Sequence, residues 1–231
     1  ADGTFNLVPM AWGTAAVTVG SVLVAAPLAI QSAVFLNFYA PVRIAMLYRR
    51  LVELLAGIPS VVYGFWGLVV LAPLIARLHP PGARLPAGVL ILALMILPTI
   101  ALVADAAMGS VPRDYLRVAA ALGMGRASII ARIVLPASRN GRGTGVGLGT
   151  ARAVGETMAV LMVCGNVVQT PASIFDPVRT LTANIALEMG YALGDHRSAL
   201  FFSGLLLMVG VMLLIVIAEW LTRGKHLAGL H

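Results

Sequence analysis

Long apolar runs without charged residues constrain this chain more than any other feature. Five apolar runs are long enough to cross about 30 Å of hydrocarbon as helices that rise about 1.5 Å per residue, and four of the five are free of charge over at least seventeen consecutive residues. They cover approximately 9–36, 52–76, 86–108, 143–168 and 198–220. Only 11% of the residues are charged and 60% are hydrophobic, whereas soluble domains carry about 25% charged residues. We therefore predict an all-α, polytopic membrane protein with about five transmembrane helices, forming a single domain over residues 1–231.

The basic residues predict how these spans are oriented. If the spans alternate, eleven of the sixteen basic residues lie on one side and four on the other, with Arg152 inside a span. Because cytoplasmic loops carry the excess of Lys and Arg, the side with eleven is cytoplasmic, and the N-terminus is outside. This bias explains the formal charge of +7, so no binding of nucleic acid is needed to explain it. The eleven are Arg43, Arg49, Arg50, Arg113, Arg117, Arg126, Arg132, Arg139, Arg142, Arg223 and Lys225, and the four are Arg77, Arg84, Arg179 and Arg197.

The polar, arginine-bearing segment 111–142 separates two apolar runs and begins with the signals of a short helix. Pro112 ends the preceding span, and Asp114 stands where a helix N-terminus favours a negative charge. The residues 119–122 are good helix formers, and Gly123 permits the left-handed turn that ends a helix. The segment therefore predicts a short cytoplasmic helix that stops at Gly123.

A second short helix is predicted after Gly125. It opens at Ser128, a residue that favours helix N-termini, and stops at Pro136. Its apolar residues recur on one face, with arginines elsewhere, and they are Ile129, Ile130, Ile133 and Val134. Physical chemistry alone leaves two interpretations of this helical pair: an interfacial anchor to anionic lipid or a docking surface for a partner protein.

The same segment resembles the EAA loop of ABC importer permeases, which has the form Glu-Ala-Ala-x3-Gly-x9-Ile-x-Leu-Pro. Ala119, Gly123 and the Ile-Val-Leu-Pro run at 133–136 match this spacing. Arg117 replaces the Glu and Val118 the first Ala, so the contact made by that Glu is not expected here. The resemblance implies a coupling helix that docks in a groove of a cytoplasmic ATPase, with contacts from Arg117, Ala119, Ala120, Leu122, Gly123, Met124 and Gly125.

Three further blocks resemble the PstC family of phosphate importer permeases. They are LLAGIPSVVYGFWG at 54–67, GETMAVLMV at 155–163 followed by Gly-Asn at 165–166, and DPVRTLT at 176–182. This resemblance implies an ABC importer type I permease fold, multi-pass insertion in a bacterial or archaeal cytoplasmic membrane, and transport of inorganic phosphate. Because the family usually has one span more than the five counted here, we expect its first helix to be missing from this sequence.

The resemblance also implies the partners. They are a PstA-like second permease, a PstB-like ATPase dimer that binds ATP and Mg²⁺, and a PstS-like phosphate-binding protein that is periplasmic or lipid-anchored. No cofactor and no catalytic residue is expected in this chain. Its only lysine is Lys225, so the glycine-rich stretch 141–149 cannot form the G-x-x-x-x-G-K-[ST] loop that binds nucleotide phosphates. The four histidines lack the spacing of a helix-borne metal site.

The glycines of the 143–168 run and its approach predict close packing instead. Gly141, Gly145 and Gly149 recur every four residues, a spacing that allows two helix backbones to approach in lipid. Within the same run, Arg152 and Glu156 stand four residues apart and are predicted to share a helical face. A charge at this depth costs about 2.5–3.5 kcal/mol even on mild scales, so the two are expected to pair or to face a watery cavity.

Two interpretations of Arg152 and Glu156 stay open: a structural pair that fixes helix packing, or a lining of the anion path. The resemblance implies the second, with Arg152, Glu156 and Thr157 in the substrate pathway.

Asp105 lies near the end of a predicted span. We predict that its side chain snorkels to the membrane interface rather than pairing with an arginine of a loop. The segment 169–197 faces outside and predicts a short re-entrant or interfacial helix.

Two alternatives to phosphate import are carried from the sequence. The first is import of another oxyanion, such as molybdate or sulfate. The EAA loop is shared among importers, so only the PstC-like blocks favour phosphate. A membrane scaffold or sensor subunit that moves no solute is the alternative from another class. Uptake of solute and the anion that stimulates the ATPase separate these alternatives.

Overall fold

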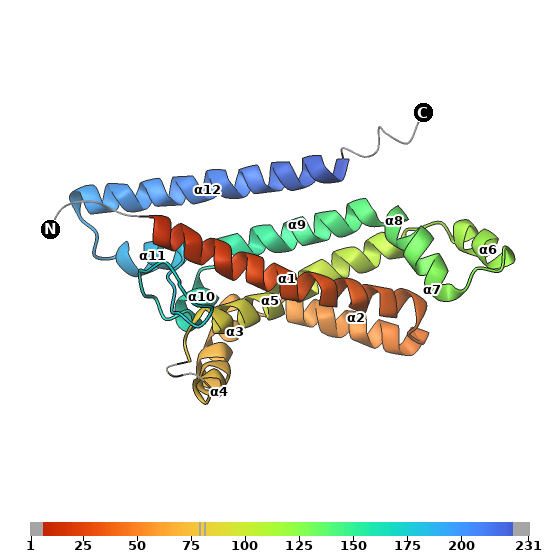
Figure 1. The fold of residues 1–231 in the computed structure, drawn as a ribbon, viewed down its shortest axis with the longest axis horizontal. Coiled ribbons are helices and arrows are strands. Elements are labelled where there is room, and N and C mark those ends of the chain that lie inside the picture. The colour runs from red at the N-terminus through yellow and green to blue at the C-terminus, as the bar shows by residue number, and fades with distance from the viewer. Residues whose placement is uncertain (1–6, 79, 81, 224–231) are drawn as a thin grey trace.

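The computed structural model describes residues 7–78, 80 and 82–223, and the regular secondary structure of this part is helical apart from one isolated β-bridge. Lys225 and the histidines at 79, 226 and 231 lie outside the described residues. Three long, unbroken helices run along the molecule: α1 (Val8–Phe38), α5 (Leu85–Gly109) and α12 (Gly194–Arg223) (Figure 1). All three are long and apolar enough to cross a membrane, which confirms the predicted spans 9–36, 86–108 and 198–220.

The predicted span 52–76 is wrong as a single straight helix. The structure has α2 (Val42–Ala56), then a bend of 91°, then α3 (Ser60–Trp66), a π-helical turn (Gly67–Leu71) and α4 (Ala72–Ala76). The break falls at Gly57-Ile58-Pro59, where Pro59 has ψ 140°. Proline disfavours the helical conformation of the residue before it and offers no backbone N–H. Hydropathy recognises the apolar composition of this stretch but not its change of direction.

The predicted span 143–168 is wrong in the same way. It consists of α9 (Arg139–Gly155) and the short α10 (Met158–Val163), separated by Glu156 and Thr157. Glu156 has ψ 131°, an extended conformation. Among the described helices, only three unbroken ones and the bent α2–α4 unit pass as candidate spans. The expected five continuous spans are therefore three continuous helices and two interrupted segments.

The buried core lies around α5, which packs against α1 on one side and α9 on another. Glycines bring α9 close to α5, as their four-residue spacing predicts. A Cβ at Gly141 would lie 2.5 Å from Ala107 Cβ, and one at Gly149 would lie 2.6 Å from Ile100 Cγ1. The helix α12 contacts α9 and α11 but stays largely exposed, so most of its apolar surface is free for lipid or for another subunit.

The segment 111–142 forms short helices at one end of the molecule, at the far right of Figure 1. They are α6 (Arg113–Ala121), α7 (Arg126–Ile129), a π-helical turn (Ile130–Val134) and α8 (Leu135–Ala137). The predicted helix stop at Gly123 is confirmed, with φ +78°. The second helix starts at Arg126 rather than Ser128.

Pro136 does not stop the second helix, contrary to the prediction. It lies in the first turn of α8, where a proline needs no N–H donor. Beyond it the chain bends at Ser138, with ψ 6°, and continues directly into α9. The predicted apolar face of this helix is confirmed, because Ile130 and Val134 are buried.

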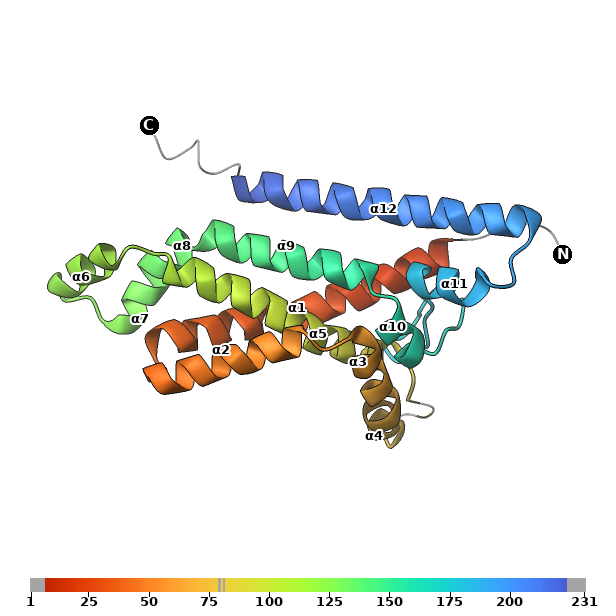
Figure 2. The ribbon, with the colours of Figure 1, turned by 180° about the vertical axis from the view of Figure 1, so that it is seen from behind.

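The two ends of the bundle separate the two groups of arginines. The start of α2 and the helices α6 and α7 lie at one end, whereas α4, α10 and α11 lie at the other (Figures 1 and 2). The short helix expected within 169–197 is α11 (Leu181–Glu188). There Arg179 donates to Glu188 at 2.6 Å, and His196 contacts the same carboxylate at 2.9 Å. The arrangement agrees with the alternation used to group the basic residues.

Candidate functional site

The α6 helix presents an exposed apolar stripe at the end of the bundle. Tyr115, Val118 and Leu122 are 59%, 61% and 77% exposed. Their spacing of three and then four residues puts them on one face of a helix. Exposed apolar side chains this close together mark an interaction surface rather than an isolated apolar residue. The stripe points away from the body of the molecule, because the opposite face of α6 packs inward.

That opposite face anchors α6 to the ends of α1 and α5. Ala119 is only 3% exposed, and Leu116 packs on a buried cluster that includes Ala104 and Met108 of α5. Ile129 and Leu135, from the second part of the segment, pack on the same cluster. Ala119, one of the predicted coupling residues, therefore faces the core and supports the stripe from beneath.

The other predicted coupling residues lie at or near the surface. Arg117 is exposed and forms an ion pair with Asp114 at 3.3 Å, with both side chains more than three quarters exposed. Such an exposed pair contributes about 0–1 kcal/mol, so Arg117 stays available to a partner. Ala120, Gly123 and Gly125 are exposed and Met124 is half-buried. The sequence missed Tyr115 and the outward face of Val118, although their spacing with Leu122 is visible in it.

Gly123 sets the direction in which α6 leaves the segment. Its φ of +78° is left-handed, a conformation that glycine adopts without the steric cost that a Cβ imposes. No described atom lies within 4 Å of where a Cβ would stand. The requirement for glycine is therefore conformational and not a matter of space.

At the C-terminal end of α9, Arg152 and Glu156 do not form the predicted pair. Arg152 Nη1 donates to Thr99 Oγ1 of α5 at 3.1 Å, and no ion pair joins it to Glu156 within the described chain. The two side chains have other partners instead: Arg152 bonds across to α5, and the Glu156 carboxylate accepts a hydrogen bond from the first turn of α10. Arg152 also lies close enough to Tyr63 of α3 for its charge to act on that phenol.

Glu156 and Thr157 instead form the interruption between α9 and α10. The Glu156 carboxylate accepts from the backbone N–H of Ala159 at 3.2 Å, in the first turn of α10. The Glu156 carbonyl accepts from Thr182 Oγ1 at 2.7 Å. Thr157 Oγ1 bonds weakly back to Gly155 O at 3.4 Å. These contacts replace the helical hydrogen bonds that the break removes, as backbone groups inside a membrane require.

A seam of buried threonines holds this interruption against α1 and α11. Thr182 Oγ1 lies 3.0 Å from Thr180 Oγ1, and the Leu181 N–H donates to Thr14 Oγ1 of α1 at 3.0 Å. The crevice that these residues line is too tight to admit a water molecule. Thr99 and Thr182 were not predicted, and the sequence marks them only as polar residues among apolar ones.

The two interrupted segments meet where α3 crosses α10 (Figure 2). A Cβ at Gly64 of α3 would lie 2.9 Å from Ala159 Cα and 3.3 Å from Met158 O. A Cβ at Gly67 would lie 2.7 Å from Ile91 of α5. The α3 backbone is therefore packed directly on the backbone of α10 at Met158 and Ala159, the two residues that follow Glu156 and Thr157.

Continuous apolar helices around two interrupted apolar segments, with a basic helical loop at one end, make up the fold of a polytopic membrane protein. The fold is shared with solved ABC importers. The MetNI methionine ABC transporter aligns with a TM-score of 0.76 at 20% identity, covering 94% of this chain and 95% of that one. A bacterial ABC transporter involved in the import of alginate aligns with a TM-score of 0.72 at 14% identity, covering 96% and 80%.

Sequence comparison gives the family. The model of the binding-protein-dependent transport system inner membrane component family matches residues 21–226, and the chain belongs to this family. It is 41% identical to a probable ABC transporter permease protein, YqgH, of Bacillus subtilis, over 97% of this chain and 74% of that protein. It is 36% identical to the phosphate transport system permease protein PstC of Mesorhizobium japonicum, over 94% and 73%.

Membership fixes the general role and location. The chain is a multi-pass permease subunit of the inner membrane, and its relatives are transport permeases rather than enzymes. The ABC importer type I permease fold that the resemblance to the PstC family implies is confirmed.

Proposed function

We propose that this chain is the membrane-spanning subunit of an ATP-driven importer of inorganic phosphate, in which it forms half of the translocation pore. The observation that carries the proposal is its similarity, over most of its length, to permeases named for phosphate transport. The blocks at 54–67, 155–163 and 176–182 support it, because they form the α2–α3 bend, the α9–α10 interruption and the approach to α11. The blocks that resemble the PstC family thus lie where the helices are interrupted.

The partners follow from this proposal. A PstA-like permease completes the pore, a PstB-like ATPase dimer hydrolyses ATP with Mg²⁺, and a PstS-like binding protein delivers phosphate in a bacterial or archaeal membrane. The exposed stripe of Tyr115, Val118 and Leu122 supports docking of the ATPase on α6. An apolar stripe on a helix whose opposite face is packed fits a groove in a partner protein better than it fits a lipid surface.

Arg152 is the residue on which we place attraction of the anion. It is half-buried, and within the described chain its polar partner is the neutral Thr99. An arginine at this depth without a carboxylate partner keeps its full charge for an anionic solute. Glu156 and Thr157 are assigned to the same path, where they keep the backbone of the interruption in place beside Arg152.

The test is transport by the complete complex. The permease is purified with its cognate partners, reconstituted in proteoliposomes containing ATP and Mg²⁺, and supplied with binding protein loaded with phosphate, sulfate or molybdate. We expect uptake of labelled phosphate, and stimulation of ATP hydrolysis by phosphate-loaded binding protein only. Equal or greater stimulation by sulfate or molybdate would assign another oxyanion. ATP hydrolysis without uptake of any anion would assign a scaffold or sensor role.

Docking of the ATPase is tested at Gly123. Gly123→Val forces a branched side chain into a left-handed conformation, at a cost of about 1–3 kcal/mol, and is expected to displace α6 and to reduce co-purification of the ATPase. Gly210→Val in α12 is the control, because Gly210 has no positive φ and no described atom lies within 4 Å of a Cβ there. Co-purification that is unchanged in Gly123→Val would favour the lipid-anchor interpretation of this loop.

A further inference from the structure

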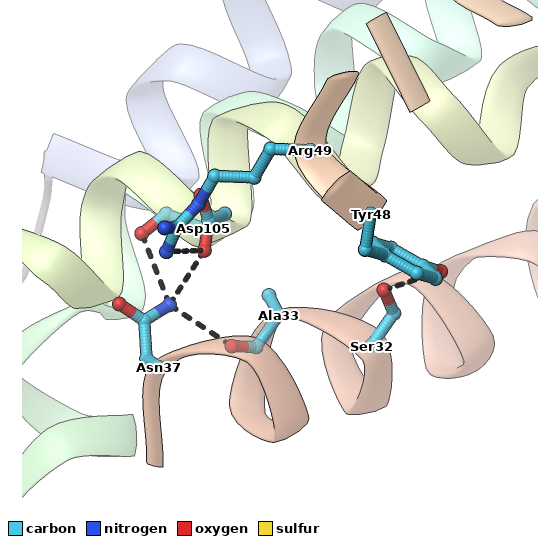
Figure 3. A network of polar contacts seen from close by, with 6 residues as sticks. All are labelled: Ser32, Ala33, Asn37, Tyr48, Arg49 and Asp105. Carbon is cyan, nitrogen blue, oxygen red and sulfur yellow. Dashed lines mark hydrogen bonds and ion pairs between the residues drawn. The ribbon is translucent and has the colours of Figure 1, made fainter. Parts of the chain in front are cut away.

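A polar network joins three helices near the end of the bundle that carries α6. The Asp105 carboxylate of α5 accepts from Arg49 of α2 at 2.7 Å and 3.0 Å, and from Asn37 Nδ2 of α1 at 2.7 Å (Figure 3). One residue before Arg49, the Tyr48 hydroxyl accepts from Ser32 Oγ of α1 at 2.8 Å. The prediction that Asp105 snorkels to the interface is wrong, because its side chain is only 13% exposed and is paired.

This network is the polar attachment of α2 to its neighbours. Of the residues of α2, all of which are described, only Ala45 and Val52 are buried. Between these two stand Tyr48 and Arg49, which reach α1 and α5. The paired, two-contact geometry of an arginine and a carboxylate fixes both distance and orientation. The position of α2 against α5 therefore depends on the Arg49–Asp105 contact together with the apolar packing of Val52.

On one side, the network adjoins the packing of the coupling segment. Asp105 lies between Ala104 and Met108 of α5, and both of these belong to the buried cluster on which Leu116 of α6 packs. Only Ser110 to Pro112 separate the end of α5 from the start of α6. A displacement of α6 is therefore transmitted first to the turns of α5 that hold Asp105.

On the other side, α2 leads to the interrupted segments. After the 91° bend, the Tyr63 hydroxyl of α3 donates to Leu55 O at the end of α2 at 2.9 Å. This hydrogen bond holds α2 and α3 together across the bend. The backbone of α3 is packed on α10 at Gly64, so a rotation of α2 displaces the residues next to Glu156 and Thr157.

We propose that Arg49 and Asp105 are positioning residues that make α2 a lever between the coupling segment and the interrupted α9–α10 segment. Movement of α6 by the ATPase shifts α5 at Asp105, the Arg49 contact carries the shift to α2, and the fixed bend passes it through α3 to α10. The inference rests on the proposed function, since it concerns the coupling of ATP hydrolysis to uptake. Its consequence is that loss of the contact separates the two activities without removing either partner.

The test measures phosphate uptake and ATP hydrolysis on the same proteoliposomes for Arg49→Gln, Asp105→Asn and Arg50→Gln. Arg50 is the matched control, because it is the neighbouring arginine and is exposed. We expect Arg49→Gln and Asp105→Asn to lower the ratio of phosphate taken up to ATP hydrolysed by about fivefold or more, the lower range of coupling between sites. Arg50→Gln is expected to keep the wild-type ratio.

An unchanged ratio in Arg49→Gln and Asp105→Asn would overturn the lever. If these two variants do not assemble, Arg49→Lys decides, because it keeps the charge and loses the two-contact geometry. A lowered ratio in Arg49→Lys would support the proposal, and a wild-type ratio would overturn it. A wild-type complex that takes up no phosphate would contradict the proposed function instead, which keeps the two failures distinguishable.

Discussion

The helices α5 and α9–α10 lie side by side in the core, yet one is continuous and the other is interrupted. The positions of the prolines alone would suggest the reverse, because α5 contains Pro98 in its interior, whereas no proline stands at the break between α9 and α10. Pro27 in α1 is likewise accommodated within a continuous helix. Proline is tolerated in apolar helices where neighbouring groups compensate for the lost hydrogen bond.

The interruption of α9–α10 instead depends on replacement partners. Thr182 donates to the Glu156 carbonyl, and the Glu156 carboxylate accepts from the first turn of α10. The comparison shows that a break forms where side chains from another segment make hydrogen bonds to the backbone groups that lose their helical partners. It also explains why the break is fixed: α3 packs on α10 through Gly64, and the threonine seam packs on the other side.

The largest expected effect is that of a methyl group at the contact between the interrupted segments. Gly64→Ala places a Cβ 2.9 Å from the backbone of Ala159, and a backbone atom cannot rotate away. We expect a loss of about 2–3 kcal/mol by overpacking, or about 4–12 °C in thermal unfolding in detergent. Gly210→Ala in the continuous α12 is the control, because no described atom lies within 4 Å there, and its unfolding temperature should be unchanged or slightly raised.

A smaller effect is expected where α9 packs on the continuous α5. Gly149→Ala brings a Cβ within 2.6 Å of Ile100 Cγ1, but this neighbour is a side chain that is able to rotate. We expect about 1 kcal/mol of destabilisation, at the low end of overpacking costs, measured in the same unfolding experiment. A loss at Gly149 that equals or exceeds the loss at Gly64 would contradict the view that the interrupted segments form the tighter contact.

The smallest of the three stability effects concerns the cap at the interruption. Glu156→Leu removes the acceptor for the Ala159 N–H and is expected to cost about 1 kcal/mol or less, as the loss of a helix cap does. Glu156→Gln keeps an acceptor oxygen and should unfold close to the wild-type temperature. If both variants lost the same stability, the negative charge of Glu156 rather than its capping contact would hold the break.

The continuous helices were predictable from the sequence because apolar runs without charge depend on composition alone. α1, α5 and α12 follow the predicted boundaries within a few residues. The turn at Gly123 was also predictable, since glycine between helix formers marks a helix stop. The packing glycines Gly141 and Gly149 were found from their spacing. Each of these signals is local, so the sequence carries it without knowledge of the fold.

The interruption of α9–α10 and the contact between α2 and α5 were not predictable, because they depend on partners far along the chain. Thr182 is 26 residues from Glu156, and Arg49 is 56 residues from Asp105. The predicted pairing of Arg152 with Glu156 is wrong because each side chain has another partner, Thr99 for Arg152 and the Ala159 N–H for Glu156. The predicted helix stop at Pro136 is wrong because this proline stands in the first turn of α8.

The most direct test of the account is phosphate uptake by Arg152→Gln in the reconstituted complex, normalised to the amount of assembled complex. If Arg152 supplies the charge that attracts phosphate beside the interruption, uptake falls by at least about tenfold, as expected from losing a hydrogen bond to a charged group of about 1.5–3 kcal/mol, while assembly is unchanged. Thr99→Val, which removes the partner of Arg152 but keeps its charge, should lose less. Near-normal uptake by Arg152→Gln would contradict the account.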